Sequence, residues 1–374
     1  MMTRVVISGS GLWTPEQSIS NEELVACYNA YADKFNEENA AAIEAGELEA
    51  KPHSSAEFIE KASGIRSRYV YTREGILDVN RMCPIIEPRD PGALSHQAEI
   101  GVYAAKKALQ DANLQASDIE AVIVACAYTQ RAYPAIAIEI QRELGIVGVA
   151  YDMLAACSAG TFGLRNAHDM VKCGTAKRVL VINPELVTPQ VNYRSRDSHF
   201  IFGDVATATV VESVDSAQSD ALFEVLSTSS ETLFSNNIRS DFSYMSRATD
   251  EDPFGESKLF SQEGRRVFKE LCPTVVEHIG KHMGKLALTP ADMTRWWFHQ
   301  ANINMNIFVA KKLLGRDPVG NEAPIVLDTY ANTASAGSLI AFNLYHKDLT
   351  TGDYGLLCSF GAGYSIGSLI LKRL

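Results

Sequence analysis

The chain has 374 residues, of which 46% are hydrophobic and 21% are charged; this composition excludes disorder for most of its length and allows two domains or one large duplicated one. The formal net charge of −11 argues against binding to nucleic acid or to an anionic membrane surface, because an acidic surface repels phosphates. We expect neither a transmembrane helix nor a secretory signal. The seven scattered cysteines include no Cys-x-x-Cys pair, so we expect no structural metal site. We therefore expect a cytoplasmic protein with reduced thiols.

The first part of the chain predicts a buried strand over residues 3–11, followed by a helix that a capping box of Ser20 and Glu23 begins. The alanine- and glutamate-rich stretch up to Lys51 also favours helix. Residues 72–94 carry three prolines and no periodicity, so we expect a loop. Regular alternation then predicts a helix at 95–112, a strand at 120–127, a helix at 134–144, a strand at 147–154, a helix at 158–172, and strands at 178–183 and 205–214.

The second half repeats this alternation. Its pattern predicts a strand at 221–228, a helix at 262–283, a strand at 295–299, a helix at 306–314, a strand at 325–328, a helix at 335–345, and an antiparallel pair of strands at 354–360 and 365–372. Alternating strands and helices are typical of an α/β fold with mainly parallel sheets. Because two similar halves meet near residues 215–220, we predict a pseudo-duplicated five-layer αβαβα architecture, with residues 1–217 as the N-terminal half and 218–374 as the C-terminal half.

Three polar residues each follow a predicted strand. Cys157 lies at a strand-to-helix turn with small neighbours, where the helix N-terminus favours a thiolate. His299 ends an aromatic strand, and Asn332 precedes a helix of small residues. Taken singly, these could be a buried structural cysteine, a packing histidine and a helix cap. Together they lie at the strand ends where α/β sheets place their sites, which predicts a common active site.

The order of these motifs resembles that of a β-ketoacyl-acyl-carrier-protein synthase III, a condensing enzyme of the thiolase superfamily. The likeness covers nearly the whole chain. Its specific motifs are Ala156-Cys157-Ser158-Ala159-Gly160, His299-Gln300-Ala301-Asn302 and Asn332-Thr333-Ala334-Ser335, and its supporting ones are Gly64-Ile65-Arg66, Phe202-Gly203-Asp204 and Phe360-Gly361-Ala362-Gly363-Tyr364. The resemblance implies a thiolase-like fold and a homodimer.

The resemblance also implies a decarboxylative Claisen condensation. Cys157 would take an acyl group from an acyl-CoA, and decarboxylation of malonyl-acyl carrier protein would supply the carbanion that attacks it. His299 and Asn332 would hold the negative charge on the second thioester, while the backbone N–H groups of Cys157 and Ala362 would hold the oxyanion on the first. Ala362 replaces a glycine common in the family, and Phe360 would pack beside the site.

By the same resemblance, basic residues near the entrance would dock the acidic carrier protein. They are Arg265, Arg266, Lys269, Lys311, Lys312 and Arg316. Each of them could equally be a solvated surface residue. Asn304 replaces a basic residue that the family often carries here. No cofactor is expected beyond the coenzyme A and phosphopantetheine parts of the substrates.

The acyl-CoA site is expected to include Phe58, Arg66, Asn302 and Phe360. Smaller members of the family stack the adenine on a tryptophan, where this chain has Phe58, and bind a phosphate with an arginine, where it has Ala62. Tyr133 would be the gatekeeper of the acyl pocket, contributed across the dimer; otherwise it would simply pack in an interface.

Two inserts relative to the smallest family members, about 27–55 and 72–94, suggest a cap that suits the entrance to a medium-chain acyl donor. The alternative is that they add core or dimer surface. Three other functions remain open. One is a condensation of two acyl thioesters without decarboxylation, which needs a glutamate base near Tyr133, where Glu139 is nearby. The second is a type III polyketide synthase, which would release free polyketides instead of carrier-bound products. The third is a non-catalytic subunit of a heterodimeric synthase.

Overall fold

The computed structural model describes residues 3–374, and within them nine strands form one mixed sheet in the order β11-β12-β13-β8-β1-β7-β6-β4-β5. β1 (Val5–Trp13) is central because it pairs with both β7 (Val205–Ser213) and β8 (Phe223–Ser235). The strands beyond β7 are β6 (Arg178–Glu185), β4 (Ala121–Cys126) and β5 (Val149–Leu154). The strands beyond β8 are β13 (Gly363–Arg373), β12 (Tyr354–Gly361) and β11 (Met293–Phe298).

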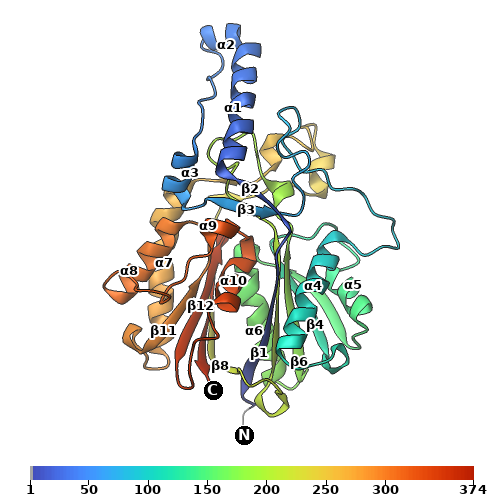
Figure 1. The fold of residues 1–374 in the computed structure, drawn as a ribbon, viewed down its shortest axis with the longest axis vertical. Helices are drawn as coiled ribbons and strands as arrows, with labels where there is room; N and C mark the ends of the chain where they lie inside the picture. The colour runs from blue at the N-terminus through green and yellow to red at the C-terminus, as the bar shows by residue number, and fades with distance from the viewer. Residues whose placement is uncertain (1–2) are drawn as a thin grey trace.

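Helices cover both outer faces of the sheet and fill the space between its two halves (Figure 1). α4 (His96–Asp111) and α5 (Ile136–Leu144) lie outside the β4–β7 half, while α7 (Gly264–Gly284) and α8 (Ile303–Leu314) lie outside the β11–β13 half. α6 (Ala159–Lys172) and α10 (Gly337–Leu344) contact strands of both halves. The result is five layers, αβαβα.

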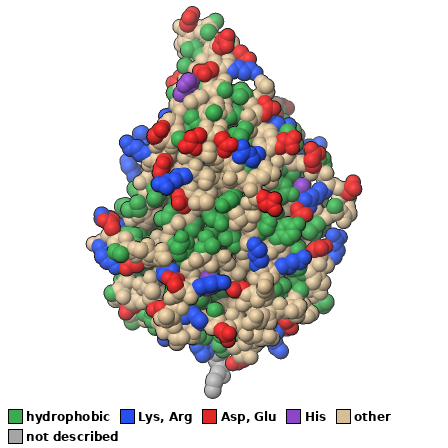
Figure 2. Space-filling model, in the orientation of Figure 1, with side chains coloured by type: hydrophobic (Ala, Val, Ile, Leu, Met, Phe, Trp, Pro, Cys, Tyr) green, Lys and Arg blue, Asp and Glu red, His purple; other side chains and the backbone are tan. Residues whose placement is uncertain are grey.

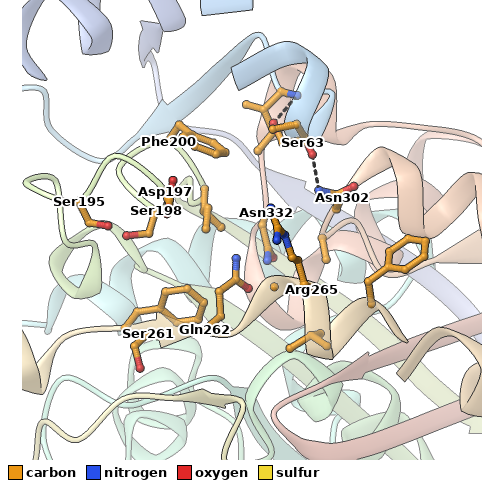
Figure 3. Close-up of a pocket in the computed structure, with 18 of the residues that line it drawn as sticks. Ser63, Ser195, Asp197, Ser198, Phe200, Ser261, Gln262, Arg265, Asn302 and Asn332 are labelled. Carbon is orange, nitrogen blue, oxygen red and sulfur yellow. Dashed lines mark hydrogen bonds between the residues drawn. The ribbon is translucent and has the colours of Figure 1, made fainter. Parts of the chain in front are cut away.

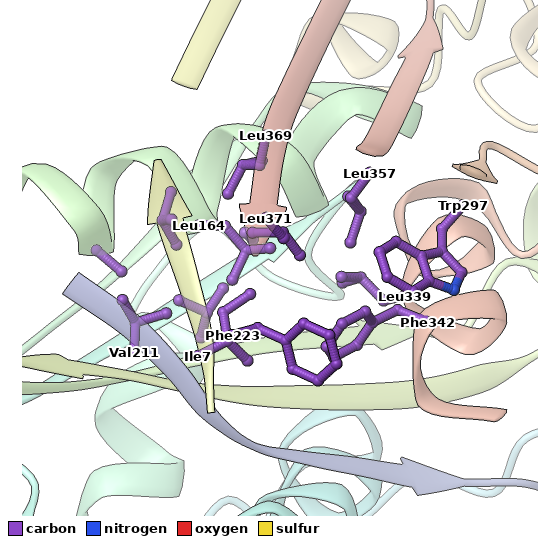
Figure 4. Packing of buried hydrophobic residues seen from close by; sticks show 14 of the residues in the cluster. Ile7, Leu164, Val211, Phe223, Trp297, Leu339, Phe342, Leu357, Leu369 and Leu371 are labelled. Carbon is purple, nitrogen blue, oxygen red and sulfur yellow. The ribbon is translucent and has the colours of Figure 1, made fainter. Parts of the chain in front are cut away.

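The middle layer is held by a continuous apolar core. Leu164 of α6 and Leu339 and Phe342 of α10 pack between strands of both halves (Figure 4). The ring of Phe342 lies edge-on to those of Phe223 and Trp297, at centroid distances of 5.4 and 5.0 Å. Because aromatic and branched side chains from both halves interlock here, the two halves fold as one packed unit.

A tower of two helices rises from this body (Figure 1). α1 (Asn21–Glu38) begins at Ser20 with the predicted capping box to Glu23, and α2 (Ala40–Glu44) follows it. α1 buries Leu24 and Tyr28 against the body, whereas its far end carries acidic side chains. Figure 2 shows acidic and basic side chains intermixed over one face of the molecule, with apolar areas across its middle.

The remaining elements are short and lie near the base of the tower. Two small sheets pair β2 (Gln17–Ser20) with β3 (Ser67–Val70) and β9 (Ile238–Arg239) with β10 (Ser261–Gln262). Two short helices are α3 (Ala56–Ser63) and α9 (Leu327–Tyr330). No helix among residues 3–374 combines the length and apolar character needed to cross a membrane.

Three expectations from the sequence are wrong. Most strand pairs within the described chain are antiparallel, because β1, β8 and β13 meet their neighbours in opposite directions; only β4–β5, β4–β6 and β11–β12 are parallel. The strand expected at 325–328 does not form; Leu327 begins α9 instead, since the preceding residues are pinned by Gln300. The helix expected up to Lys51 ends at Glu44. The loop at 72–94 is confirmed, as is the final antiparallel pair of strands.

Replacing Gly9 with alanine should destabilise the fold. A Cβ at this position in β1 would lie 2.3 Å from the backbone oxygen of Ala108 in α4, so the helix must shift. We expect the free energy of unfolding to fall by about 1–3 kcal/mol, measured by urea denaturation. In the control Gly92→Ala, the added Cβ has no neighbour within 4 Å among the described residues, and stability should change by less than about 0.5 kcal/mol. If the two variants are equally stable, β1 and α4 do not pack as closely at Gly9 as described.

Candidate active site

Cys157 lies in a tight turn between β5 and α6. The turn is the 3₁₀ segment η2 (Ala156–Ser158), and Ala156 adopts a positive φ of 46°, a conformation that non-glycine residues rarely take. Ser158 Oγ donates to the backbone oxygen of Ser365 at 2.7 Å, which fixes the turn to β13. A Cβ at Gly361 would lie 2.6 Å from the Cβ of Cys157, so the β12–β13 turn is packed directly against Cys157.

The thiol of Cys157 is protonated at neutral pH. Burial and the nearby carboxyl of Glu185 raise its pKa to about 12, and the favourable backbone N–H of its own turn does not offset them. The expectation that the helix end stabilises a thiolate is therefore wrong for the free protein. The physical reason is that removal from water and a like charge both disfavour the anion.

His299 directly follows β11. Its backbone N–H donates to the oxygen of Cys358 at 2.8 Å, and its ring lies edge-on to Phe360 at 5.4 Å. Burial lowers the pKa of the imidazole to about 4, so the ring is neutral at pH 7. Nδ1 is buried and has no hydrogen-bond partner among the described residues, so a proton placed there would be unpaired. The neutral ring therefore favours its proton on Nε2, which makes Nε2 a donor.

Asn332 follows α9 rather than a strand, because the expected strand does not form. The backbone fixes it on both sides: its N–H donates to Ile201 oxygen at 2.9 Å, and its oxygen accepts from Gly203 at 3.1 Å. The side-chain Oδ1 accepts from the N–H of Ala334 at 2.9 Å. Since Oδ1 is occupied in this way, the amide presents its NH₂ group as the free end.

These three residues stand on segments that contact one another. The turn η2 packs against β12 and β13 and against η8 (Ala334–Ala336), which follows Asn332. Cys157 also packs on the apolar cluster that contains Phe202, and Phe202 pairs with Asn332 in an isolated bridge. His299 reaches the same place through Phe360, the neighbour of Gly361. Ala362 forms the β12–β13 turn, and its carbonyl accepts from Ser365 Oγ at 2.9 Å.

Glu185 is a buried carboxyl that sequence reasoning missed. Its Oε1 accepts from the N–H of Ala127 at 3.0 Å and from the N–H and hydroxyl of Ser335, whereas its Oε2 has no partner among the described residues. Burial raises the pKa of Glu185 to about 7 despite these donors. The carboxyl ties β4 and β6 to η8 and places a titratable charge near Cys157. Only its position at the end of a buried strand could have pointed to it.

A cavity of about 840 Å³ leads to the site. Its walls come from α3, the 192–201 loop, the start of α7 and the start of α8, and Figure 3 shows Asn332, Arg265, Asn302 and Phe200 arranged around it. Among the residues expected at the substrate entrance, Phe58, Asn302, Arg265 and Lys269 line this cavity. Asn302 also caps α8 and donates to the oxygen of Ala62 at 2.8 Å, so it holds the wall in shape.

Other expected binding residues do not line this cavity. Arg66 pairs with Glu60, Arg266 with Glu263, Lys311 with Asp317 and Arg316 with Glu322. The ammonium of Lys312 lies 5.7 Å from the centre of the Phe308 ring. Tyr133 is 82% exposed and lies away from the cavity. Glu139, the possible base of a non-decarboxylative enzyme, is buried and engaged by Arg131 and by the N–H of Ser95.

Arg196 is a second residue that sequence reasoning missed. Its guanidinium lies 3.9 Å from the centre of the Phe58 ring, and its Nε donates to the oxygen of His53 at 2.8 Å. Because Phe58 lines the cavity, this contact places a cation over the ring of a wall residue. Arg196 lies in a loop without periodicity, so no local signal in the sequence connects it with Phe58, 138 positions earlier (196 minus 58).

Comparisons with known proteins agree with this geometry. Residues 151–230 match the family "3-Oxoacyl-[acyl-carrier-protein (ACP)] synthase III", and residues 283–373 match its C-terminal part. The chain is 52% identical to a β-ketodecanoyl-[acyl-carrier-protein] synthase of Pseudomonas aeruginosa, over 92% of this chain and 99% of that protein. It is 31% identical to a β-ketoacyl-[acyl-carrier-protein] synthase III of Brucella anthropi, over 85% of this chain and 91% of that protein.

Solved structures show the same fold. The crystal structure of 3-oxoacyl-[acyl-carrier-protein] synthase III from Aquifex aeolicus matches with a TM-score of 0.75 and 25% identity, covering 98% of this chain and 99% of that one. The priming β-ketosynthase of the R1128 polyketide pathway matches with a TM-score of 0.78 and 24% identity, covering 100% and 97%. The thiolase-like five-layer fold expected from the sequence is thereby confirmed.

Replacing Glu185 with glutamine should make Cys157 more reactive. The change removes a negative charge that raises the pKa of the thiol, so a larger thiolate fraction should be present at pH 8. We expect alkylation of Cys157 by iodoacetamide to become about 3- to 10-fold faster. In the glutamine variant the rate should rise about tenfold per pH unit between pH 7 and 9, because this range lies below the pKa of the thiol, whereas in the wild-type protein the rise should be shallower near pH 7, where Glu185 becomes charged.

The measurement is peptide mass spectrometry of a timed alkylation, with the exposed Cys173 as the control within each sample. Cys173 should be labelled at the same rate in both proteins. Equal labelling of Cys157 in both would show that Glu185 does not act on the thiol.

Proposed function

The chain belongs to the 3-oxoacyl-[acyl-carrier-protein] synthase III family, and from this premise we propose that it joins an octanoyl starter to malonyl-acyl carrier protein to give 3-oxodecanoyl-acyl carrier protein. Condensation of an acyl starter with malonyl-acyl carrier protein is the reaction of its relatives, and the chain is such an acyl-transferring enzyme. Two observations support the proposal: Cys157, His299 and Asn332 lie on segments that contact one another, and Asn332 lines a cavity whose walls include α3 and α7.

The length of the starter follows from carbon counting. The relative that shares 52% identity is named for a β-ketodecanoyl product, which has ten carbons. Condensation with a malonyl group adds two carbons after loss of CO₂, so its starter would have eight. Because the identity extends over 92% of this chain, we assign the same medium-chain starter here. This agrees with the medium-chain donor suggested by the two inserts.

In the first half-reaction, the sulfur of Cys157 attacks the thioester carbonyl and coenzyme A leaves as its thiol. The thiol of Cys157 has a pKa of about 12, so its proton must leave as the carbon–sulfur bond forms. The carbon–sulfur bond of the thioester then breaks, and the proton ends on the sulfur of coenzyme A. The oxyanion that forms on the carbonyl would be held by the backbone N–H groups of Cys157 and Ala362.

In the second half-reaction, malonyl-acyl carrier protein loses CO₂ and its α-carbon attacks the acyl-Cys157 carbonyl. The carbon–sulfur bond to Cys157 then breaks, and the released thiolate takes up a proton from water. Negative charge grows on the malonyl thioester oxygen before the new bond forms. His299 Nε2–H and the Asn332 NH₂ group are neutral donors that suit this charge. Their backbone anchors keep both in place, so little reorganisation is needed when the charge appears.

The surface near the cavity suits both acyl-CoA and the acyl carrier protein, which each present the acyl group on a phosphopantetheine arm. We propose that the pair of Phe58 and Arg196 stacks the nucleotide base of acyl-CoA at the mouth. Arg265 and Lys269, which line the wall, supply the positive charge that an acidic carrier protein requires. Arg266, Lys311 and Arg316 are paired with carboxylates and are weaker candidates for this role.

We also propose a homodimer built on the edge of the sheet. β5 is the last strand on its side, and its ends, Val149 and Leu154, are 48% and 59% exposed. An open apolar edge of this kind favours pairing with another strand. The exposed Tyr133 lies on the segment before α5, which packs on β5, so it would face the partner. The free cysteines fit the reducing conditions of the cytoplasm, where we place the reaction.

The two half-reactions can be separated by variants. With octanoyl-CoA alone, the wild-type protein should gain one octanoyl group on Cys157, and Cys157→Ala should gain none. His299→Ala and Asn332→Ala should still release CO₂ and form 3-oxodecanoyl-acyl carrier protein, but about 10²- to 10³-fold more slowly, because each loses one donor to the developing charge. Intact-protein mass spectrometry and labelled CO₂ release measure the two steps. Failure of the wild-type protein to release CO₂ from malonyl-acyl carrier protein would refute the decarboxylative assignment.

Charge reversal at the entrance tests carrier docking. Arg265→Glu should raise the KM for malonyl-acyl carrier protein by about tenfold at low salt, and the effect should shrink at high salt. Arg266→Glu, the next residue on the same helix but outside the cavity wall, is the matched control and should raise KM less than about threefold. The KM is measured by steady-state kinetics at two salt concentrations. If the two variants raise KM equally, Arg265 in the cavity wall does not belong to the docking surface for the carrier protein.

A further inference from the structure

Gln300 is a completely buried polar residue that directly follows His299 in the chain. Its side-chain nitrogen Nε2 donates to two backbone oxygens, that of Phe298 in β11 at 2.9 Å and that of Pro324 at 3.3 Å. Both protons of the amide are therefore used, and their two acceptors fix the direction of the side chain. The amide oxygen Oε1 is left to accept hydrogen bonds, and it does so at the start of α9.

The amide oxygen of Gln300 caps α9, which has only four residues. It accepts from the N–H of Val326 at 3.0 Å and from that of Leu327 at 3.3 Å. The first N–H groups of a helix have no partner within the helix, and Val326, at the N-cap position, offers them no side-chain hydrogen bond. So short a helix is not stable alone. Gln300 therefore supplies, from a distant part of the chain, the cap that the local sequence lacks.

Gln300 also contacts the chain beyond Asn332. A Cβ added at Gly337, where α10 begins, would lie 3.0 Å from the Cβ and 3.1 Å from the backbone nitrogen of Gln300. Gln300 thus meets the segment from Val326 to Gly337 at both of its ends, and Asn332 lies near the middle of that segment. The backbone of residues 201–203 binds Asn332 from its other side.

We propose that Gln300 is a positioning residue that sets the place of Asn332 relative to His299. The inference rests on the proposed function, because it assumes that these two side chains hold the charge formed during decarboxylation. His299 is fixed by its backbone bond to Cys358 and by the ring of Phe360. Because Gln300 follows His299 directly and caps the helix that leads to Asn332, one side chain sets the spacing of the two donors.

The two half-reactions should respond differently to the loss of this side chain. In a preorganised site, displacing a donor by about 1 Å can slow a reaction by about 10²-fold, because the hydrogen bond to the developing charge lengthens and bends. Decarboxylation uses the Asn332 NH₂ group in this way. The oxyanion of the acylation step is instead assigned to the backbone N–H groups of Cys157 and Ala362. Loss of Gln300 should therefore slow decarboxylation and spare acylation.

The test begins with Gln300→Met, which removes all four hydrogen bonds and keeps the approximate length of the side chain. Release of labelled CO₂ from malonyl-acyl carrier protein, measured on protein that already carries octanoyl-Cys157, should be about 10- to 100-fold slower than in the wild type. Acylation of Cys157 by octanoyl-CoA, followed by timed intact-protein mass spectrometry, should stay within about threefold of the wild-type rate.

A double variant tests whether Gln300 acts through Asn332. In protein that carries Asn332→Ala, adding Gln300→Met should slow CO₂ release by less than about threefold further, because the side chain that Gln300 positions is already gone. A purely structural role would instead let the two losses add.

Gln97 offers a matched control in the other half of the molecule. It is completely buried, its Nε2 donates to the backbone oxygens of Tyr128 at 2.9 Å and Pro184 at 3.1 Å, and its Oε1 accepts from the N–H of Gln130 at 2.6 Å. Gln97→Met removes this similar set of bonds, and urea denaturation compares the stability of the two variants. It should slow CO₂ release by less than about threefold relative to acylation.

Gly337→Ala is a second variant that presses on Gln300 from α10 and removes none of its hydrogen bonds. Its CO₂ release should be about 3- to 10-fold slower than in the wild type, again with acylation unchanged, because the added Cβ must push the two segments apart by a few tenths of an ångström. This variant decides the question even if Gln300→Met does not fold.

The outcomes separate this inference from the proposed function. If the wild-type protein releases no CO₂ from malonyl-acyl carrier protein, the proposed function fails, and the inference fails with it. If the wild type releases CO₂, the inference is overturned when Gln300→Met keeps the wild-type rate, slows both half-reactions equally, or adds its full loss to that of Asn332→Ala. The same selective loss in Gln97→Met, or an unchanged rate in Gly337→Ala, would also overturn it.

Discussion

The site depends on the close packing of two turns. Gly361 lies so near Cys157 that no side chain fits between them, and Ser158 is tied to the backbone of Ser365. This contact joins the half of the molecule that carries Cys157 to the half that carries His299. The apolar contacts of α6 and α10 hold the two halves at the distance that makes it possible. The chemistry proposed for the chain therefore depends on how β12 and β13 pack against η2.

Burial sets the electrostatic character of the centre. It raises the pKa of Cys157 to about 12 and lowers that of His299 to about 4, so the thiol and the imidazole are neutral near pH 7, whereas Glu185, with its pKa raised to about 7, is partly ionised there. The groups proposed to contact the substrates therefore carry no charge of their own. In such a low-dielectric space, neutral donors act strongly on a charge that appears only during the reaction. The same burial explains why the thiol cannot rely on the helix end alone.

The sequence predicted most elements because local signals agree with the fold. The capping box at Ser20, the β-branched strand before Cys126 and the small-residue turn at Cys157 are each short-range features. Strand direction was mispredicted because it depends on which neighbours meet in the sheet, as for β1 between β7 and β8. The strand expected before Asn332 failed for a related reason: Gln300, distant in sequence, fixes that segment.

At the site, the turn motifs predicted Cys157, His299 and Asn332 as candidates, but the contacts between segments could not be predicted from local sequence. Glu185 and Arg196 contact residues that are distant in sequence, so the residues next to them in the chain do not predict these contacts. The ion pairs that engage Arg66 and Arg316 are likewise tertiary. Sequence patterns thus identify which residue types are available, whereas folding decides which of them remain free to meet a substrate.

The 840 Å³ cavity has a kinetic consequence, because both thioesters would use it to reach the same sulfur. The first donor must depart before the second can enter, so the enzyme would work in a ping-pong order. A large excess of acyl-CoA would then compete with malonyl-acyl carrier protein for the empty cavity of the acylated enzyme. Flux through the enzyme would thus depend on the balance of the two substrate pools rather than on either one alone.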